Sequence, residues 1–287
     1  MYQKPFLKWV GGKTQIIDKV MNKFPREMND YHEIFLGGGS ILLALLNKYQ
    51  NKEISIRGNI YAYDYNETLI NLFKNLRDNH STLITKLIEI QDIYNNIPTL
   101  KGRDKGKDET KESFYYWIRD KFNKSKESVD KSVMFLFLNK TCFRGLYRVG
   151  PNGFNVPFGH YKQNLKFPIK DLHNIKELIK NVIFIHSDFN KSIVNVKKGD
   201  FVYLDPPYAP ESDKSFVSYT ESKFNEYTHM NLFKLTKSLK CKFVMSNSCV
   251  KMILDNFKDY EIEKVIARRS INSKVPNSRT TEVIIFK

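Results

Sequence analysis

The chain has 287 residues, of which 41% are hydrophobic, and its 47 Lys and Arg against 31 Asp and Glu give a formal net charge of +16. This length and apolar content predict one large or two modest domains with a core, and they argue against global disorder. No run approaches the roughly 20 apolar residues of a membrane-spanning helix, the first residues lack a signal peptide's apolar run, and the three cysteines suit neither a disulfide framework nor a zinc site. We therefore expect an intracellular protein that is not secreted, with no membrane partner and no metal.

Short apolar runs alternate with longer helical patterns along the chain, which is typical of an α/β fold. In the first part of the chain the patterns predict strands at 31–36 and 59–64 and helices at 40–49, 66–78 and 81–94. The middle part is predicted to contain a polar loop at 98–108, helices at 111–122 and 129–139, and a hairpin or irregular segment at 144–161. The last part is predicted to contain strands at 181–186, 200–204, 242–246, 260–266 and 281–286, and helices at 223–239 and 249–257.

The order of these elements predicts one doubly wound sheet that is interrupted by an insertion at residues 75–168. The run at 200–204 is apolar on both faces, as a buried parallel strand should be. We therefore expect an α/β fold with a mostly parallel sheet.

The positive charge is unevenly distributed along the chain. Residues 131–170 contain no Asp or Glu, and their basic residues are Lys131, Lys140, Arg144, Arg148, Lys162, Lys166 and Lys170. Aromatic residues are interleaved with them, which favours a surface that meets the phosphates and bases of a nucleic acid. A Lys-rich composition without any polyanionic partner is the alternative explanation.

The first motif with chemical meaning is EIFLGGGS at 33–40, in which a predicted strand ends in three glycines and a helix begins. Glycines allow the backbone to approach a ligand closely, and a helix N-terminus offers free N–H groups. The second predicted strand ends at Asp64, where an acid can accept hydrogen bonds from a ribose diol. The pattern indicates a nucleoside-type cofactor site, with a tight strand-to-helix turn as the alternative.

The second motif is DPPY at 205–208, directly after the strand predicted at 200–204. Ligands of open α/β sheets bind beyond the carboxyl ends of such strands. Because the two prolines make the turn rigid, the Asp205 carboxylate and the Pro206 carbonyl are fixed acceptors that can grip both hydrogens of an amino group. Tyr208 offers an aromatic face on which a planar base can stack. An ordinary strand-ending turn with a capping Asp is the alternative.

Two further elements are weaker on their own. Trp9 and Lys13 flank a glycine pair and could contact the ring and the carboxylate of a ligand, although a packed Trp beside a solvated Lys is the commoner case. Asp188 follows the strand predicted at 181–186 and could face the same crevice, or it could be a helix N-cap.

Taken in order, PFLKWVGGK, FLGGGS, YDYN, SDF and DPPY resemble the Dam-type DNA adenine methyltransferases, and the segment at 138–162 resembles the target-recognition region of that family. The resemblance implies site-specific transfer of a methyl group from S-adenosylmethionine to the exocyclic N6 amine of a flipped adenine in double-stranded DNA. It also implies a methyltransferase sheet, formed by 1–74 and 169–287, which binds the cofactor and catalyses the transfer. The inserted, mainly helical region 75–168 would recognise the target.

The resemblance implies roles for individual residues by their position in the motifs. The cofactor would be lined by Trp9, Lys13, Phe35, Gly37, Gly39, Asp64, Asp188 and Phe189. The flipped adenine would be bound by Asp205, Pro206 and Tyr208, with Asp205 as a hydrogen-bond acceptor rather than a full general base.

Four residues of the recognition region are candidates for DNA contact: Lys140, Phe143, Arg144 and Arg148. Arg is the commonest bidentate partner of guanine, so we expect Arg148 to contact a guanine edge, while Phe143 would wedge into the base stack. Phosphate-only contacts for the arginines and core packing for Phe143 are the alternatives. Arg144 stands where the family usually has Asn, which leaves the exact target open, with a GATC-like palindrome as the family default.

Three other functions remain compatible with these motifs. The same DPPY tetrad suits methylation of RNA or of a protein glutamine, although the basic, aromatic insertion favours a nucleic acid. A non-catalytic DNA-binding module on a degenerate scaffold is a second alternative, against which the intact motifs argue. The third is an interaction protein whose charge reflects composition only. A cognate restriction endonuclease that acts on the same site is a partner that the resemblance allows.

Overall fold

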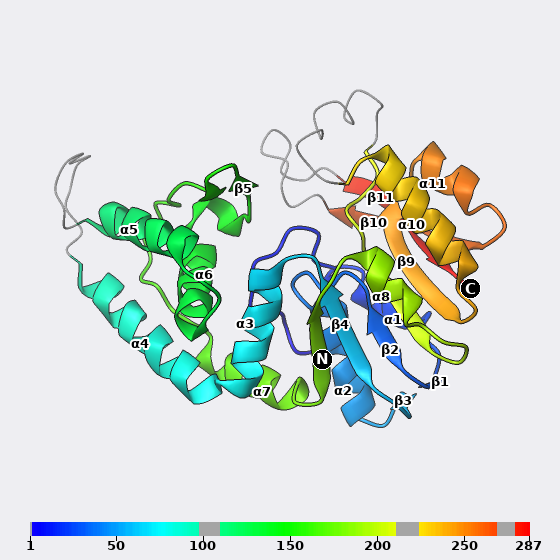
Figure 1. The fold of residues 1–287 in the computed structure, drawn as a ribbon, viewed down its shortest axis with the longest axis horizontal. Helices are drawn as coiled ribbons and strands as arrows, with labels where there is room; N and C mark the ends of the chain where they lie inside the picture. The colour runs from blue at the N-terminus through cyan, green and yellow to red at the C-terminus, as the bar shows by residue number, and fades with distance from the viewer. Residues whose placement is uncertain (1, 98–109, 211–223, 269–278) are drawn as a thin grey trace. The chain divides into compact units, whose positions relative to one another are not determined.

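The computed structural model describes residues 2–97, 110–210, 224–268 and 279–287, which form two compact units (Figure 1). Unit 1 comprises Met1–Gly12, Gly37–Leu43 and Asn66–Lys180. Unit 2 comprises Lys13–Leu36, Ala44–Tyr65 and Asn181–Lys287. The loop predicted at 98–108 lies outside the described residues. These ranges differ from the predicted domain boundaries at 75 and 168, and the functional roles of the domains remain predictions.

Unit 2 contains a central, mostly parallel sheet, which confirms the predicted mixed α/β fold. Its strands, in spatial order, are β10 (Glu261–Arg268), β11 (Arg279–Phe286), β9 (Lys242–Ser248), β8 (Phe201–Leu204), β2 (Tyr31–Glu33), β4 (Ile60–Asp64) and β7 (Val182–His186). The pairs from β9 to β7 are parallel, whereas β11 is antiparallel to both β9 and β10. The parallel strands therefore present their carboxyl ends at one edge of the sheet.

Helices cover the sheet because its central strands are apolar on both faces. Val202 and Leu204 of β8 belong to a core cluster formed with α8 (Phe189–Val194), α10 (Glu226–Ser238) and α11 (Lys251–Asn256), which lie on one face (Figure 1). The alternate β8 residues Phe201 and Tyr203 instead contact Phe24, which follows α1 (Ile17–Met21). This strand is thus buried on both sides, as its uninterrupted apolar sequence predicts.

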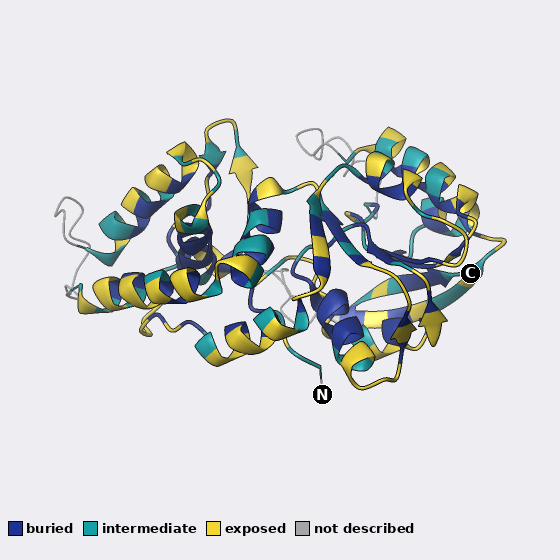
Figure 2. Ribbon diagram, turned by 60° about the horizontal axis from the view of Figure 1, so that its bottom comes forward, coloured by how far each residue is buried: buried dark blue, intermediate teal, exposed yellow. Residues whose placement is uncertain are grey.

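Unit 1 is built around one helix that is buried along most of its length. That helix is α6 (Val129–Thr141), whose SVMFLFLN stretch is apolar on nearly every side and therefore favours complete burial. It packs against α3 (Glu67–Asp78), α4 (His80–Asn96) and α5 (Lys111–Lys124). These surrounding helices carry buried residues on one side and exposed residues on the other (Figure 2).

Helix starts in unit 1 have the expected capping chemistry. Asn66 accepts a hydrogen bond from the backbone N–H of Leu69 at the start of α3, and Ser128 accepts one from Lys131 at the start of α6. Thr110 forms a reciprocal capping box with Ser113 at the start of α5. These side chains satisfy N–H groups that have no partner within the helix.

Several short elements were not predicted from the sequence. They are α1, the two-stranded β1 (Glu27–Met28) and β3 (Ser55–Ile56), and α7 (Ile169–Leu178). The strand predicted at 31–36 is shorter in the structure, where β2 ends at Glu33. The backbone N–H of Ile34 still donates a hydrogen bond to the Tyr203 carbonyl. The hairpin predicted within 144–161 is present as β5 (Val149–Gly150) paired with β6 (Gly153–Phe154). The helix predicted at 40–49 is α2 (Ser40–Gln50), which starts at the predicted residue.

Buried polar side chains fix the amino ends of β2 and β8. The Nε2 atom of His32 lies 3.3 Å from Oδ2 of Asp200, and Asp200 also accepts hydrogen bonds from the backbone N–H groups of Asp30 and Lys197. Burial lowers the pKa of His32, and the neighbouring Asp200 opposes that shift. This cluster holds the segment before β8 against β2, at the edge away from the strand carboxyl ends.

Within the described ranges, no helix is long and apolar enough to cross a lipid bilayer.

Candidate active site

Acidic residues lie at the carboxyl ends of three parallel strands of unit 2. Asp64 is the last residue of β4, Asp188 follows β7, and Asp205 follows β8. The register sets Asp64 opposite His186, so the ends of β4 and β7 lie next to each other. Because ligands of open α/β sheets bind at this edge, the three acids mark it as the candidate site.

Asp205 forms a buried ion pair with Lys13. The Nζ atom of Lys13 lies 2.8 Å from Oδ2 of Asp205, and the two side chains are 4% and 19% exposed. Burial raises the pKa of Asp205 to about 6, although Lys13 lowers it. The other carboxylate oxygen, Oδ1, is buried and has no hydrogen-bond partner among the described residues. A buried acceptor without a partner is costly, so this oxygen is suited to receive a donor from a ligand.

Tyr208 is held from two sides. Its phenolic oxygen donates a hydrogen bond to Oε2 of Glu282 over 2.8 Å, and the Lys13 ammonium lies 4.8 Å from the centre of its ring. Burial raises the pKa of Tyr208 well above its ordinary value, and the charges of Asp205 and Glu282 add to that shift. The phenol is therefore neutral and acts as the donor in its bond to Glu282.

The DPPY turn is anchored to β9 by a buried amide. The Oδ1 atom of Asn247 accepts a hydrogen bond from the backbone N–H of Ala209 over 3.1 Å, and the Ser248 hydroxyl donates to the Ala209 carbonyl over 2.6 Å. Asn247 is fully buried and Pro206 is buried as well. The backbone that carries Asp205 and Pro206 is therefore fixed at its far end by the neighbouring strand.

An aromatic cluster lies beside the acids at the ends of β2 and β7. The ring centres of Phe35 and Phe189 are 5.9 Å apart, and Phe224 lies 6.1 Å from Phe35 and 5.8 Å from Phe189. Asp188 is the N-cap of α8, where its side chain accepts a hydrogen bond from the backbone N–H of Asn190 over 2.8 Å. The structure thus brings Phe35 and Phe189 together, and it places Asp188 in the capping position that the sequence left open.

In unit 1 the glycine turn is shaped by Trp9. A Cβ atom on Gly37 would lie 3.1 Å from Cδ1 of Trp9, and one on Gly38 would lie 3.0 Å from its Cβ. Gly37 and Gly39 have φ angles of 50° and 73°, which favour glycine. Trp9 also stacks on Tyr147 with ring centres 5.3 Å apart. The turn therefore needs glycine for close packing and for its backbone conformation.

Three of the four candidate DNA-contacting residues of unit 1 are exposed and precede β5 in the chain, whereas Lys140 lies near the end of α6. Phe143 is 45% exposed, and the Arg144 guanidinium lies 5.3 Å from the centre of its ring. Arg144 has a φ of 57°, in the left-handed region that is rare for residues other than glycine. The Nε of Arg148 donates to Oδ1 of Asn155 over 2.7 Å, so the hairpin orients this guanidinium. Lys140 is partly buried, and burial lowers its pKa.

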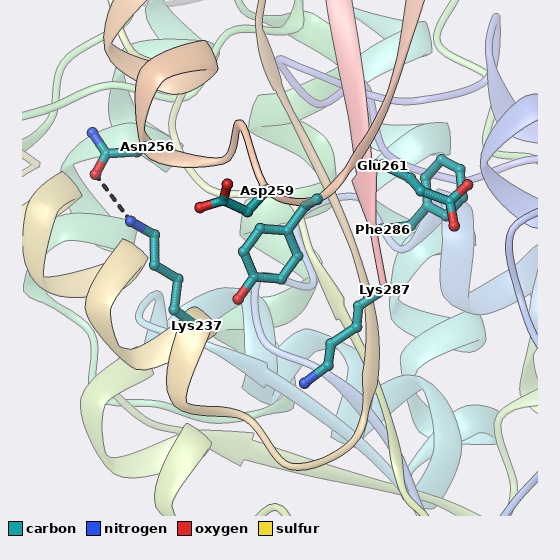
Figure 3. Close-up of a pocket in the computed structure, with 7 residues that line it drawn as sticks. Lys237, Asn256, Asp259, Glu261, Phe286 and Lys287 are labelled. Atoms are coloured by element: carbon teal, nitrogen blue, oxygen red, sulfur yellow. Dashed lines mark hydrogen bonds between the residues drawn. The ribbon is translucent and has the colours of Figure 1, made fainter.

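Unit 2 also has a surface depression, which lies away from the carboxyl ends of the parallel strands (Figure 3). It is lined by Lys237, Asn256, Asp259, Tyr260, Glu261, Phe286 and Lys287. Glu261 starts β10 and Phe286 ends β11, and the N–H of Lys287 donates to the Phe243 carbonyl near the start of β9. The depression therefore lies at the edge opposite the carboxyl ends of the parallel strands, and none of the predicted site residues lines it.

The sequence did not single out three residues that the structure places at the candidate site. They are Phe224, Asn247 and Glu282. Asn247 and Glu282 lie on β9 and β11, far along the chain from the DPPY turn that they contact. The pairing of β8 with β9 and of β9 with β11 brings Asn247 and Glu282 to the DPPY turn. No local sequence motif indicates that pairing.

Comparison with known proteins places the whole chain in one family. The family model described as D12 class N6 adenine-specific DNA methyltransferase matches residues 9–271. The chain is 38% identical over 288 residues to the type II methyltransferase M.MjaIII of Methanocaldococcus jannaschii, across 96% of this chain and 94% of the relative. It is 30% identical over 285 residues to a DNA adenine methylase of Haemophilus influenzae, across 96% and 90% of the two chains.

Proposed function

The chain belongs to the D12 class of N6 adenine-specific DNA methyltransferases, and from this premise we propose which residues bind adenine, cofactor and target. The observation that carries the proposal is the Oδ1 atom of Asp205, a buried acceptor without a partner at the carboxyl end of β8. The group that receives the methyl in this family is an exocyclic amine. Its N–H groups can donate the hydrogen bond that this oxygen lacks.

In the proposed site, Asp205 and Pro206 activate the amine by accepting its two hydrogens. The lone pair of an aromatic amine is conjugated with the ring, which makes the nitrogen a poor nucleophile. Hydrogen bonds to Oδ1 of Asp205 and to the Pro206 carbonyl turn the lone pair away from the ring, while Lys13 keeps the other carboxylate oxygen occupied. As the nitrogen takes up the methyl group, the bond from that carbon to the sulfonium sulfur would break with its electron pair left on sulfur. The nitrogen becomes positive and readily releases a proton to solvent, so Asp205 acts as an acceptor rather than a strong base.

Tyr208 stacks on the flipped adenine in this proposal. An exocyclic amine is buried in duplex DNA, so the base has to leave the helix before it can react, and an aromatic ring compensates for the lost base stacking. The hydrogen bond to Glu282 and the ammonium of Lys13 fix the Tyr208 ring before the base arrives.

S-adenosylmethionine is the methyl donor implied by the family, and the residues at the strand ends fit it. When bound, it supplies an electrophilic methyl group on a sulfonium. Phe35 and Phe189 offer an apolar flank for an adenosine. Asp64 ends β4 and Asp188 follows the end of the neighbouring β7, where a carboxylate can accept from ribose hydroxyls.

The proposal assigns further cofactor contacts to the segment around the glycine turn. Gly37 and Gly39 follow β2 directly along the chain, and Trp9 packs on this turn. Lys13 was predicted as a cofactor contact, and its bond to Asp205 supports an additional role in holding that carboxylate ionised.

We assign target recognition to the helical region 75–168, with Lys140, Phe143, Arg144 and Arg148 as its DNA contacts. The exposure of Phe143 and of both arginines supports this assignment. We propose a short, GATC-like target, a site of action where DNA is accessible inside the cell, and pairing with a restriction endonuclease of the same specificity. The type II names of relatives support that last point.

Family membership decides among the alternatives left open by the sequence. RNA and protein glutamine are not the acceptors that the family description names, and a non-catalytic module would not need an unpartnered acceptor at the DPPY turn.

Calorimetry with S-adenosylmethionine tests the cofactor assignment. We expect Phe35→Ala and Asp64→Ala to weaken binding about tenfold or more, because each removes a direct contact. Asp259→Ala, in the depression at the opposite edge of the sheet, is the matched control and should bind like the wild type. Unchanged affinity in the first two variants would contradict the assignment.

A further inference from the structure

We propose that Glu282 is a positioning residue, which holds the Tyr208 ring at a set angle so that the flipped base stacks on it without reorganisation. The inference rests on the proposed role of Tyr208 in binding adenine. It concerns a residue of β11 that does not touch the reacting atoms.

A hydrogen bond ties the Tyr208 phenol to the Glu282 carboxylate. The Tyr208 phenol donates to Oε2 of Glu282 over 2.8 Å, a distance typical of a hydrogen bond to a carboxylate. A tyrosine ring rotates about two side-chain bonds, and this tether at the far end of the side chain removes most of that freedom. The cost of ordering the ring is then met during folding rather than during base binding.

The two faces of the Tyr208 ring differ in what lies over them. The ammonium of Lys13 lies over the Tyr208 ring, 4.8 Å from its centre, and the same ammonium is bonded to Asp205. The Lys13 ammonium occupies one face of the ring, so a base would stack on the opposite face, with Glu282 fixing the tilt of the ring.

The group that holds the Tyr208 phenol is a carboxylate on a strand of the sheet. Glu282 lies on β11 opposite Ser248 of β9, and β9 also anchors the turn through the bond from the Ala209 N–H to Asn247. Paired strands of the sheet therefore fix both the backbone and the phenol of the DPPY turn. Hydrogen bonds to a charged acceptor are about twice as strong as neutral ones, so a carboxylate gives the tighter tether.

Glu282 also acts on the charge of the site. Among the residues that the structure describes, the titratable groups around Asp205 are Lys13, Glu282, Tyr203 and Tyr208. Lys13 lowers the pKa of Asp205, whereas Glu282 raises it. Loss of the Glu282 charge should therefore move the acidic limb of the activity profile toward lower pH.

The test is a double-mutant cycle with Tyr208→Phe, Glu282→Ala and the double variant. Each single variant should lower kcat/KM for DNA by about tenfold or more, and the double variant should be no worse than the poorer single variant. Glu282→Gln keeps an acceptor and should recover most of the loss. Glu263→Ala on the neighbouring strand β10 is the matched control, because Glu263 pairs with Lys23 instead.

Two further readouts separate positioning from folding. Fluorescence of 2-aminopurine, placed at the adenine that sequencing identifies as the target, should be lower or slower to develop in Glu282→Ala, while its S-adenosylmethionine affinity and Tm remain those of the wild type. Multiplicative losses in the cycle, or an unchanged 2-aminopurine signal in Glu282→Ala, would overturn the inference. If Asp205→Ala is also fully active, the proposed adenine site itself is wrong.

Discussion

Replacement of Lys13 by Met removes the charge that opposes the Asp205 carboxylate and leaves a side chain of similar length. Loss of one partner from a buried ion pair costs about 3–5 kcal/mol if the other charge stays, and Asp205 can avoid this cost by taking up a proton. One pKa unit corresponds to about 1.36 kcal/mol, and solvent screens a carboxylate that is 19% exposed, so we expect a rise of about 1–2 units from the wild-type value of about 6.

The expected sign follows from the form of Asp205 that binds the amine. Only the ionised carboxylate accepts hydrogen bonds through both oxygens, so activity should be lost as the pH falls through the pKa. In Lys13→Met the acidic limb of kcat/KM should therefore move up to about pH 7–8, and the rate at pH 7 should fall between about twofold and tenfold. Activity should recover at higher pH, and Lys13→Arg should keep the wild-type profile.

Methyl transfer to DNA, measured from pH 5 to 10 together with S-adenosylmethionine affinity, tests this expectation. The matched control is Lys23→Met, which breaks the more exposed pair with Glu263. An acidic limb at the wild-type position in Lys13→Met would refute the reasoning. If cofactor affinity fell at the same time, Lys13 would act as the cofactor contact that the sequence motif predicts.

Three other outcomes are expected. Arg148→Ala should relax discrimination at one base position by about 1–3 kcal/mol, and a uniform loss across all sequences in a competition assay would make it a phosphate contact. Gly37→Ala should lower the free energy of unfolding by about 1–2 kcal/mol, because Gly37 has a positive φ and lies close to the Trp9 ring. Gly12→Ala should be nearly neutral, and equal effects of the two changes in urea titrations would contradict this. Asn247→Ala should loosen the DPPY turn and lower kcat more than cofactor affinity, and steady-state kinetics with calorimetry would detect the opposite pattern.

The strands and the DPPY turn could be predicted because their signals are local. The apolar run before Asp205 predicts a buried strand, and the two prolines predict a rigid turn, with no knowledge of the rest of the chain. Asn66 and Ser128 are equally local, because a capping side chain contacts backbone only three residues away. Such features depend on neighbours in sequence, so a single sequence is enough to find them.

The contacts that complete the site could not be predicted, because they depend on tertiary pairing. Tyr208 and Glu282 are 74 residues apart, and Ala209 and Asn247 are 38 residues apart. The burial of Lys13 against Asp205 likewise needs the folded unit, since a lysine after two glycines is usually solvated. The sequence motifs thus predict the reacting groups, whereas the sheet register determines which side chains hold the residues of the DPPY turn.

The most direct test of the account uses purified protein, unmethylated plasmid DNA and S-adenosylmethionine, followed by single-molecule sequencing for N6-methyladenine. The wild type should methylate adenine within one short motif, and Asp205→Ala should produce no methyladenine while it binds the cofactor as the wild type does. Substantial methylation by Asp205→Ala would contradict the central claim that the buried oxygen of this carboxylate holds the reacting amine.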